Sequence, residues 1–172
     1  MKNKLRNFAK TKRKKIDTEK ISVFIAQNIR KSEIFKKSKN ILIFYPKQYE
    51  LNLLSLTENR GKNWFLPRCR GNELEVCPYS PGDELKMSCF KVLEPICESV
   101  HAQIADLVIT PALGADLKKH RLGYGKGYYD RFFEKSKAVK ILAVPNCLIF
   151  ESVFPEEYDI ACDFVVSEKG MF

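Results

Sequence analysis

The sequence predicts an α/β fold with three layers (αβα), in which an open, mostly parallel sheet lies between helices. Three short apolar runs, each closed by a proline, are typical of strands buried on both faces, and they occupy residues 41–45, 107–110 and 139–144. Apolar residues at helical spacing precede the first run and place helices at the N-terminus. A turn motif between two further strands predicts an antiparallel edge to the sheet.

Two helices are expected before the first strand. Residues 2–15 carry apolar side chains at helical spacing on an otherwise basic segment, which predicts an amphipathic helix. A second apolar stripe starts after Asp17 or Thr18, and either side chain can cap the first backbone N–H groups of a helix. We expect this second helix to run to about Lys36.

The chain after the first strand alternates between helix and strand. Residues 51–59, which follow an acidic residue, read as a helix. Residues 63–68 and 73–77 read as strands, and Gly71-Asn72 between them favours a hairpin. The last two apolar runs enclose a glycine-rich loop and a helical pattern. This order predicts a right-handed βαβ crossover whose loop lies at the carboxyl edge of the sheet.

Composition limits the class of protein. With 172 residues, 45% of them apolar, the chain is large enough for one globular domain, which we place at residues 1–172. No apolar run reaches the roughly 20 residues of a membrane span, and no secretory-type apolar region follows the basic start, so we expect a cytoplasmic protein. The six cysteines form no CxxC pair, which favours reduced thiols over a zinc site. A net charge of +9 favours polyanionic partners.

The most informative stretch runs from Arg121 to Arg131 and reads RLGYGKGYYDR. Gly123, Gly125 and Gly127 stand at every second position, where they permit positive φ angles and let consecutive N–H groups turn toward one ligand. A helical pattern follows, and the N-terminus of a helix attracts anions. The loop therefore predicts a phosphate site.

Two charged side chains strengthen this prediction. Lys126 adds a positive charge within the loop, and a helix that begins at about Gly125 would place Asp130 one turn further along the same face. A cation and a carboxylate would then meet, as a phosphate with its magnesium requires. The alternative is a flexible glycine turn that caps an ordinary amphipathic helix.

Residues 121–131, together with the apolar strand at 106–111 and with Asp116, resemble the signature of the 5-formyltetrahydrofolate cyclo-ligase family. The resemblance implies an ATP- and Mg²⁺-dependent conversion of 5-formyltetrahydrofolate to 5,10-methenyltetrahydrofolate on an α/β fold of this length. It implies phosphorylation of the formyl oxygen, attack by N10, and release of ADP and phosphate. We assign the neutralisation of charge on the migrating phosphoryl group to Lys126 and Arg121.

The resemblance also implies an ATP site built from two segments. Near the N-terminus, Lys2-Asn3-Lys4-Leu5-Arg6 matches a Lys-x-x-Leu-Arg element of the family, and the alternative is a solvated basic face. The second segment is the glycine loop. The residues expected to contact ATP are Lys2, Asn3, Lys4, Leu5, Arg6, Arg121, Leu122, Gly123, Tyr124, Gly125, Lys126, Gly127, Tyr128 and Tyr129.

For the folate, the resemblance implies contacts with Tyr45, Glu50, Phe90, Tyr124 and Tyr128. A carboxylate at Glu50 can accept the paired N–H donors of an aminopyrimidine edge, although it can equally complement the start of a helix. An aromatic ring at Phe90 can stack on a flat heterocycle, although it can equally pack in the core.

For the metal, the resemblance implies Asp130 and Asp163, although Asp163 can also be a surface residue that caps a strand. Three residues depart from the family pattern: Lys91 and Lys119 replace glycines, and Ala115 replaces an aromatic residue. These departures leave open the shape of the folate pocket and do not touch the phosphate loop.

Two other classes of protein stay open at this point. The basic charge and the tyrosines of the glycine loop also suit a nucleic-acid-binding module. A different ATP-dependent enzyme on the same fold, such as a small-molecule kinase, is the nearer alternative. The resemblance favours ATP and 5-formyltetrahydrofolate as partners of a monomer or weak homo-oligomer, without nucleic acid or membrane.

Overall fold

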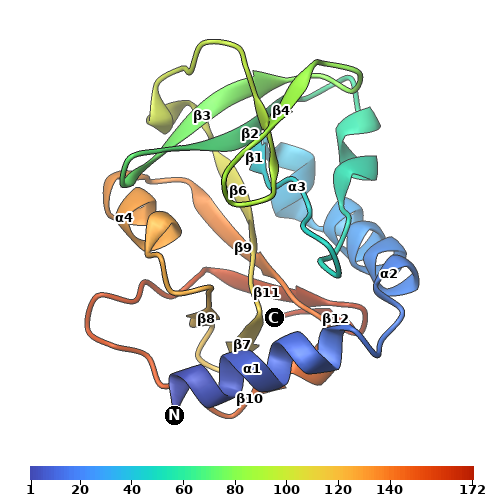
Figure 1. The fold of residues 1–172 in the computed structure, drawn as a ribbon. Helices are drawn as coiled ribbons and strands as arrows, with labels where there is room; N and C mark the ends of the chain where they lie inside the picture. The colour runs from blue at the N-terminus through green and yellow to red at the C-terminus, as the bar shows by residue number, and fades with distance from the viewer.

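The computed structural model describes residues 1–172 and has the three-layer α/β architecture that the sequence predicts (Figure 1). Its central sheet has seven strands in the order β12-β11-β9-β6-β1-β2-β3. The inner strands from β11 to β2 are parallel, whereas β3 and β12 pair antiparallel at the two edges. These strands are β1 (Asn40–Ile43), β2 (Asn63–Arg70), β3 (Glu73–Tyr79), β6 (Leu107–Pro111), β9 (Val139–Ala143), β11 (Phe164–Ser167) and β12 (Gly170–Met171).

Two small sheets and three 3-10 turns complete the strand connections. The predicted antiparallel edge is confirmed at β2 and β3, whose turn contains Gly71 at a φ of 58°. The small sheets contain β10-β7-β8 and β4-β5. The remaining elements are β4 (Leu85–Met87), β5 (Leu93–Pro95), β7 (Gly114–Asp116), β8 (Arg121–Leu122), β10 (Ile149–Phe150), η1 (Leu54–Glu58), η2 (Ala102–Ile104) and η3 (Asn146–Leu148).

The N-terminal helices form where the sequence predicts them, but the second one is interrupted. Asp17 caps α2, because its carboxylate accepts a hydrogen bond from the Lys20 N–H at 2.9 Å. The expected continuation to Lys36 is wrong, because Ser32 is extended (ψ 141°) and its hydroxyl caps a separate short helix. The helices are α1 (Lys2–Arg13), α2 (Thr18–Lys31), α3 (Glu33–Lys37) and α4 (Tyr128–Lys135).

Two other helix predictions also need correction. The helix expected at residues 51–59 is only the 3-10 turn η1. The helix expected from about Gly125 begins at Tyr128, because Gly127 adopts a left-handed conformation (φ 68°) as its N-cap. Lys126 therefore precedes the helix and does not share a helical face with Asp130.

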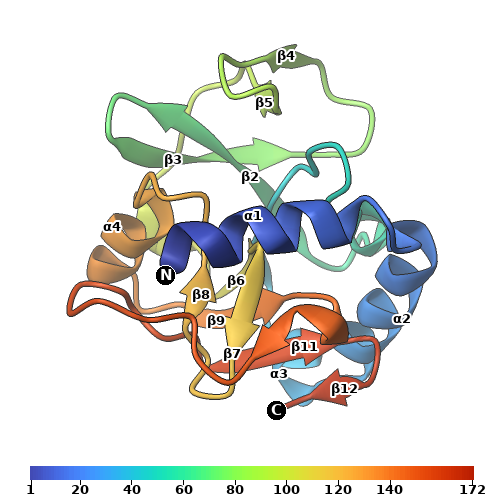
Figure 2. The ribbon, with the colours of Figure 1, turned by 60° about the horizontal axis from the view of Figure 1, so that its bottom comes forward.

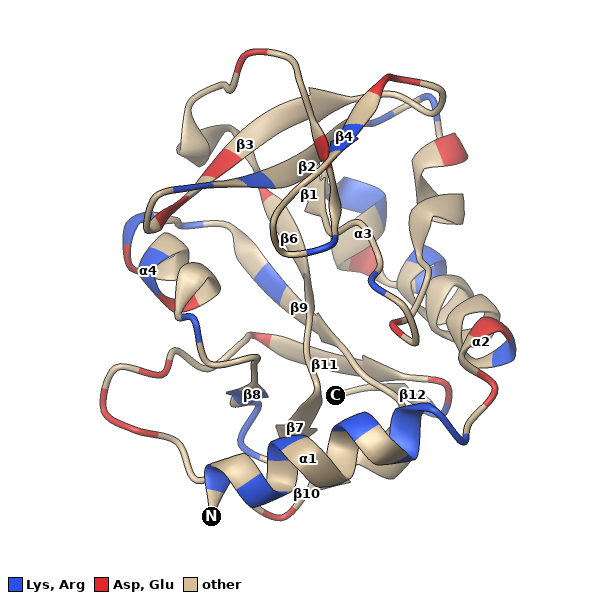
Figure 3. Ribbon diagram, in the orientation of Figure 1, with Lys and Arg blue, Asp and Glu red and all other residues tan.

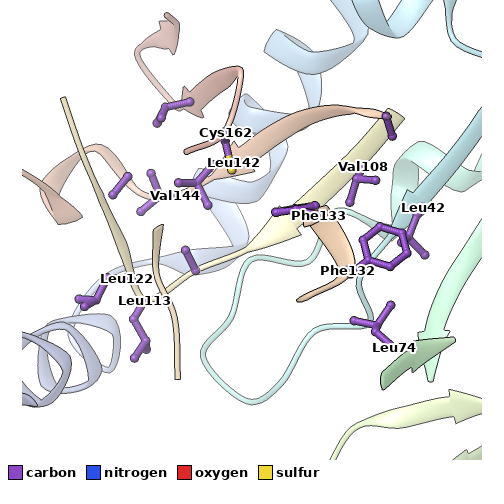
Figure 4. Packing of buried hydrophobic residues seen from close by; sticks show 14 of the residues in the cluster. Leu42, Leu74, Val108, Leu113, Leu122, Phe132, Phe133, Leu142, Val144 and Cys162 are labelled. Carbon is purple, nitrogen blue, oxygen red and sulfur yellow. The ribbon is translucent and has the colours of Figure 1, made fainter. Parts of the chain in front are cut away.

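The sheet is buried on both faces, and its side chains alternate between two cores. In β1, Leu42 joins the cluster beneath α1 and α4, while Ile41 and Ile43 join the cluster beneath α2 and α3. Phe132 and Phe133 of α4 lie against the first cluster (Figure 4), and Figure 2 shows α1 crossing the same face. Each buried side chain of this size contributes roughly 1.5–3 kcal/mol, so the two cores account for most of the stability. All six cysteines are free thiols.

The connection from β6 to β9 places the glycine loop. These strands are parallel neighbours, and the chain between them passes through β7, β8, the loop and α4. The loop therefore lies near the carboxyl end of β6, as the predicted crossover requires. None of the helices combines the length and the apolar composition needed to cross a membrane.

Candidate active site

A cavity of about 510 Å³ opens beside the carboxyl ends of β1 and β6. The segments that surround it include the start of α1, the loop after β1, β2, residues 90–94, the glycine loop, and the loop at residues 156–159. Most residues that the sequence analysis nominated line this one cavity. They are Lys2, Arg6, Tyr45, Glu50, Phe90, Arg121, Gly123, Tyr124, Gly125, Lys126, Gly127, Tyr128, Tyr129 and Asp130.

Four nominated ATP contacts lie outside the cavity lining. Leu5 and Leu122 pack against or within a hydrophobic core, because they fall on the inner faces of α1 and β8. Lys4 is exposed to solvent. Asn3 contacts a residue of the cavity lining, because its side-chain oxygen accepts a hydrogen bond from Arg6 Nη1 at 2.7 Å.

The glycine loop is held open in a conformation that other residues adopt only with strain. Gly125 and Gly127 have φ angles of 91° and 68°. The guanidinium of Arg6 lies over the loop, where its Nε donates a hydrogen bond to the Gly123 carbonyl at 3.0 Å. Lys126 is exposed and makes no hydrogen bond or ion pair through its side chain. We call Lys2, Arg6, Arg121 and Lys126 the cationic wall.

Asp130 lies in the first turn of α4, where it is paired with Arg121. Arg121 Nη2 donates to Asp130 Oδ2 at 2.8 Å, and the guanidinium lies 5.1 Å from the centre of the Tyr129 ring. Burial raises the pKa of Tyr129 above its usual value. The Arg121 side chain is 8% exposed, and its Nε has no partner. An anion in the cavity would therefore meet a fixed guanidinium beside a carboxylate.

The loop at residues 156–159 brings two further carboxylates to the site. Lys2 Nζ donates a hydrogen bond to Asp159 and lies 3.6 Å from Glu156 Oε1. Burial disfavours the ionised form of Asp159, but the bonds from Lys2 and from the Glu156 N–H outweigh it and lower the pKa of Asp159. No motif pointed to this loop. Its only sequence signal is the acidic stretch that begins at Glu156.

Asp163 is placed away from the cavity. It precedes β11, accepts a hydrogen bond from the Lys140 N–H at 2.7 Å, and lies 3.6 Å from Lys140 Nζ. It is not among the residues that line the cavity. The structure therefore does not bring Asp163 to Asp130, and its contacts are those of an aspartate that caps strands.

The opposite side of the cavity is built around a buried carboxylate. Glu50 accepts hydrogen bonds from the Tyr124 hydroxyl at 2.5 Å and from the Lys47 N–H at 2.8 Å. Lys47 Nζ lies 4.6 Å from the centre of the Tyr124 ring, a contact that no motif predicted. Burial, with the repulsion of Glu50, raises the pKa of Tyr124, so its hydroxyl stays protonated. We call Glu50, Tyr124 and Lys47 the carboxylate wall.

The geometry bears on the alternatives for Glu50 and Phe90. No α-helix starts after Glu50, and its carboxylate is used by Tyr124 and Lys47 instead. Phe90 lines the cavity and meets Tyr128 edge to face, with ring centres 5.7 Å apart, rather than packing in either core. The rings of Phe90 and Tyr128 thus form an aromatic side to the cavity.

Two of the three departures from the family pattern keep a backbone conformation that suits glycine. Lys91 and Lys119 have φ angles of 57° and 68°, so both lysines adopt the left-handed conformation that a glycine favours. Ala115 is fully buried in β7.

The cavity contains no activated nucleophile. Its one thiol, Cys69, is protonated at neutral pH, because burial and the neighbouring Glu94 raise the pKa of Cys69 to about 11. The arrangement can bind an anion on one side and a flat polar ring on the other.

This architecture belongs to the class of parallel α/β proteins. Such proteins bind small ligands at the carboxyl edge of the sheet. The positive charge and the glycine loop further indicate a ligand with phosphate groups. The chain belongs to the 5-formyltetrahydrofolate cyclo-ligase family, whose model matches residues 1–168. The resemblance inferred from residues 121–131 is thereby confirmed.

Characterised relatives agree with this membership. The chain is 31% identical over 132 residues to the probable 5-formyltetrahydrofolate cyclo-ligase of Schizosaccharomyces pombe, covering 70% of this chain and 63% of that protein. It is 30% identical over 144 residues to the 5-formyltetrahydrofolate cyclo-ligase of Escherichia coli K12, covering 77% and 79%.

Solved structures confirm the fold. The NMR structure of Aquifex aeolicus 5,10-methenyltetrahydrofolate synthetase matches with a TM-score of 0.88 and 30% identity, over 99% of this chain and 91% of that chain. The Mycoplasma pneumoniae 5,10-methenyltetrahydrofolate synthetase matches with a TM-score of 0.78, over 97% and 98% of the two chains. Its identity of 17% supports the fold alone.

Proposed function

We propose that this protein converts 5-formyltetrahydrofolate to 5,10-methenyltetrahydrofolate with ATP and Mg²⁺, releasing ADP and phosphate. The observation that carries the proposal is the meeting of the cationic wall and the carboxylate wall in one cavity. One wall suits the phosphates of a nucleotide, and the other suits the polar edge of a pterin. Membership of the cyclo-ligase family supports the same reaction.

The reaction needs ATP because the formyl group is an amide, whose carbon is a poor electrophile and whose oxygen is a poor leaving group. Transfer of the γ-phosphoryl group to the formyl oxygen releases ADP and gives an N5-iminium phosphate. N10 then attacks the former carbonyl carbon and loses its proton. The carbon–oxygen bond breaks, phosphate departs with the bonding electrons, and the methenyl bridge remains.

The cationic wall would stabilise the charge on the phosphoryl group during its transfer. Lys126 is free to turn toward a phosphate because its side chain has no partner. Arg121 is fixed by Asp130, and Arg6 is fixed by the Gly123 carbonyl, so neither guanidinium needs to be ordered by the ligand. Positioned charges of this kind are the main source of catalysis in phosphoryl transfer.

The residues at this wall fit a magnesium ion that arrives with a nucleotide. Asp130 contacts Arg121, and the charge of Arg121 also contributes to the lowered pKa of Asp159, which places both carboxylates near one guanidinium. Mg²⁺ is usually bound by one or two carboxylates together with phosphate oxygens and water. We therefore propose Asp130 and Asp159 as its ligands in place of the pair with Asp163. The ion would neutralise phosphate charge.

The carboxylate wall would hold the pterin. Glu50 has four lone-pair positions, of which Tyr124 and Lys47 use two, so two remain for the N–H donors of an aminopyrimidine. Phe90 and Tyr128 offer ring faces and edges to the same cavity, and Tyr45, two residues after β1, also lines it. These contacts would place the formyl group toward the glycine loop.

The test is a spectrophotometric assay, because the methenyl product absorbs in the near ultraviolet and 5-formyltetrahydrofolate does not. We expect the absorbance to rise only when the protein, ATP, Mg²⁺ and 5-formyltetrahydrofolate are all present. ADP should form in equal amount. A stable phosphorylated product without methenyl absorbance would identify a kinase instead, and no ATP turnover with any folate would contradict the proposal.

A further inference from the structure

Arg13 is the one side chain of α1 whose charge is buried. The helix is strongly basic, and Figure 3 shows lysines and arginines at several positions along it. Arg13 is only 4% exposed, although it belongs to the last turn of the helix. Burial of an arginine needs partners, because removing a charge from water costs several kcal/mol.

Arg13 has one partner in the chain after β6 and a second partner in the carboxylate wall. Its Nη2 donates a hydrogen bond to the Ala112 carbonyl, in the chain that follows β6. Its Nη1 lies 3.9 Å from Glu50 Oε1. Its Nε is buried and has no hydrogen-bond partner. The hydrogen bond to the Ala112 carbonyl therefore satisfies only part of the guanidinium.

Four titratable or charged groups surround the Glu50 carboxylate. Tyr124 of the glycine loop donates its hydroxyl, and Tyr129 of α4 is near enough for Glu50 to contribute to its raised pKa. Lys47 contributes its backbone N–H, while its ammonium group lies over the Tyr124 ring. Arg13 is therefore the only cation within 4.0 Å of this carboxylate.

We propose that Arg13 is a positioning residue for substrate recognition, which orients the Glu50 carboxylate so that two of its lone pairs face the aminopyrimidine edge of a reduced pterin. This inference rests on the proposed function for the identity of the ligand. Without the guanidinium, the carboxylate loses its only cation within 4.0 Å and is no longer held toward the ligand. Folate affinity would therefore fall.

Substitution separates this role from simple anchoring of α1. Arg13→Met keeps the length of the side chain but removes its charge and its bond to Ala112. Arg13→Lys keeps the charge and loses only the forked geometry. Lys12→Met is the matched control, because Lys12 is exposed on the same helix and its loss changes only surface charge.

The first measurement is the Kd for 5-formyltetrahydrofolate, determined by calorimetry near neutral pH. We expect this Kd to rise about tenfold in Arg13→Met, because the buried carboxylate loses its only cationic partner. In Lys12→Met and Arg13→Lys it should stay within about twofold of the wild-type value. An unchanged Kd in Arg13→Met overturns the proposal.

The second measurement compares the KM values for 5-formyltetrahydrofolate and for ATP. In Arg13→Met the KM for the folate should rise about tenfold, while the KM for ATP changes less than about twofold. An equal rise in both KM values, or an equal rise of the folate KM in Arg13→Lys, indicates an anchoring role and contradicts the proposal. If Arg13→Met does not fold, Arg13→Lys still decides, because retained charge must retain the folate KM. Absence of methenyl formation by wild type would refute the proposed reaction, while the calorimetry would still decide the role of Arg13.

Discussion

The two walls of the cavity carry charge in different ways. On the cationic wall, Lys126 is exposed and unpaired, whereas Lys2, Arg6 and Arg121 already contact other parts of the chain. On the carboxylate wall, Glu50 is 7% exposed and is already held by Tyr124, by a backbone N–H and by Arg13. Lys126 is therefore ready to receive charge, and Glu50 has its charge fixed before the ligand arrives.

This difference teaches how the two walls should respond to mutation. A solvated charge contributes little to folding, so its removal should affect function alone. A buried charge is part of the fold, and its removal leaves its partners unsatisfied. Substitution of Lys126 should therefore separate activity from stability, and substitutions on the carboxylate wall should couple them.

The largest effect is expected from Lys126→Ala. It removes an unpaired ammonium group from the glycine loop, and loss of a charged contact in the transition state lowers kcat about 100-fold. The unfolding transition should stay within about 0.5 kcal/mol of wild type, since the side chain is exposed. Lys10→Ala, on the exposed face of α1, is the control and should retain full activity. Wild-type turnover in Lys126→Ala would remove this residue from the mechanism.

Glu50→Gln should affect both folding and binding. The amide cannot accept from Tyr124 and a ligand as a carboxylate does, and it leaves the Arg13 guanidinium without a counter-charge. We expect the free energy of unfolding to fall by about 2 kcal/mol, and the KM for the folate to rise about tenfold or more. Urea denaturation and steady-state kinetics measure the two effects. Glu134→Gln, an exposed change on α4, should alter neither. If Glu50→Gln lost folate binding but kept full stability, the expected difference between the two walls would be wrong.

Much of the cationic wall could be predicted from sequence because its residues lie in one continuous motif. Three glycines, a lysine and an aspartate within residues 121–131 specify a local anion site, and the fold needs only to place that loop at the edge of a sheet. Proline-closed apolar runs likewise predicted the parallel strands. The prediction that Lys126 lies within the helix was wrong, because Gly127 rather than Gly125 is the N-cap of α4.

The parts that the sequence did not reveal depend on contacts between distant segments. Arg13 and Glu50 meet across 37 positions of the chain, and Lys2 meets Asp159 across 157. Neither Asp159 nor Lys47 lies in a motif, so only folding brings them to the cavity. The interruption at Ser32 was also invisible, because its flanks keep a helical apolar pattern while the serine caps the next helix.

Gly125→Ala is expected to have an intermediate effect, through the backbone. A φ of 91° is strained for alanine, and the cost is about 1–2 kcal/mol of stability. Gly82→Ala is a matched control, because Gly82 has a φ of 102°, open space around it, and a position outside the cavity. Both variants should lose similar stability in thermal unfolding, but only Gly125→Ala should weaken ATP binding measured by calorimetry. Equal ATP affinity in the two variants would show that the loop does not bind the nucleotide.

The smallest effect is expected from Asp159→Asn. This variant tests whether Lys2, unlike Lys126, is held by an ion pair. Lys2, unlike Lys126, has a carboxylate partner in the folded protein, and the pKa of Asp159 is lowered against the opposing effect of burial. An acid whose pKa is lowered on folding contributes stability above its unfolded pKa of about 3.9, and this contribution disappears as the pH falls through the folded pKa. Wild type should therefore exceed Asp159→Asn by about 0.5–1 kcal/mol in urea denaturation at pH 7 and at pH 5. The difference should shrink below about pH 4 and in high salt. A difference that persists unchanged at low pH would mean that Asp159 stabilises the loop without its charge, and Lys2 would then be as free as Lys126.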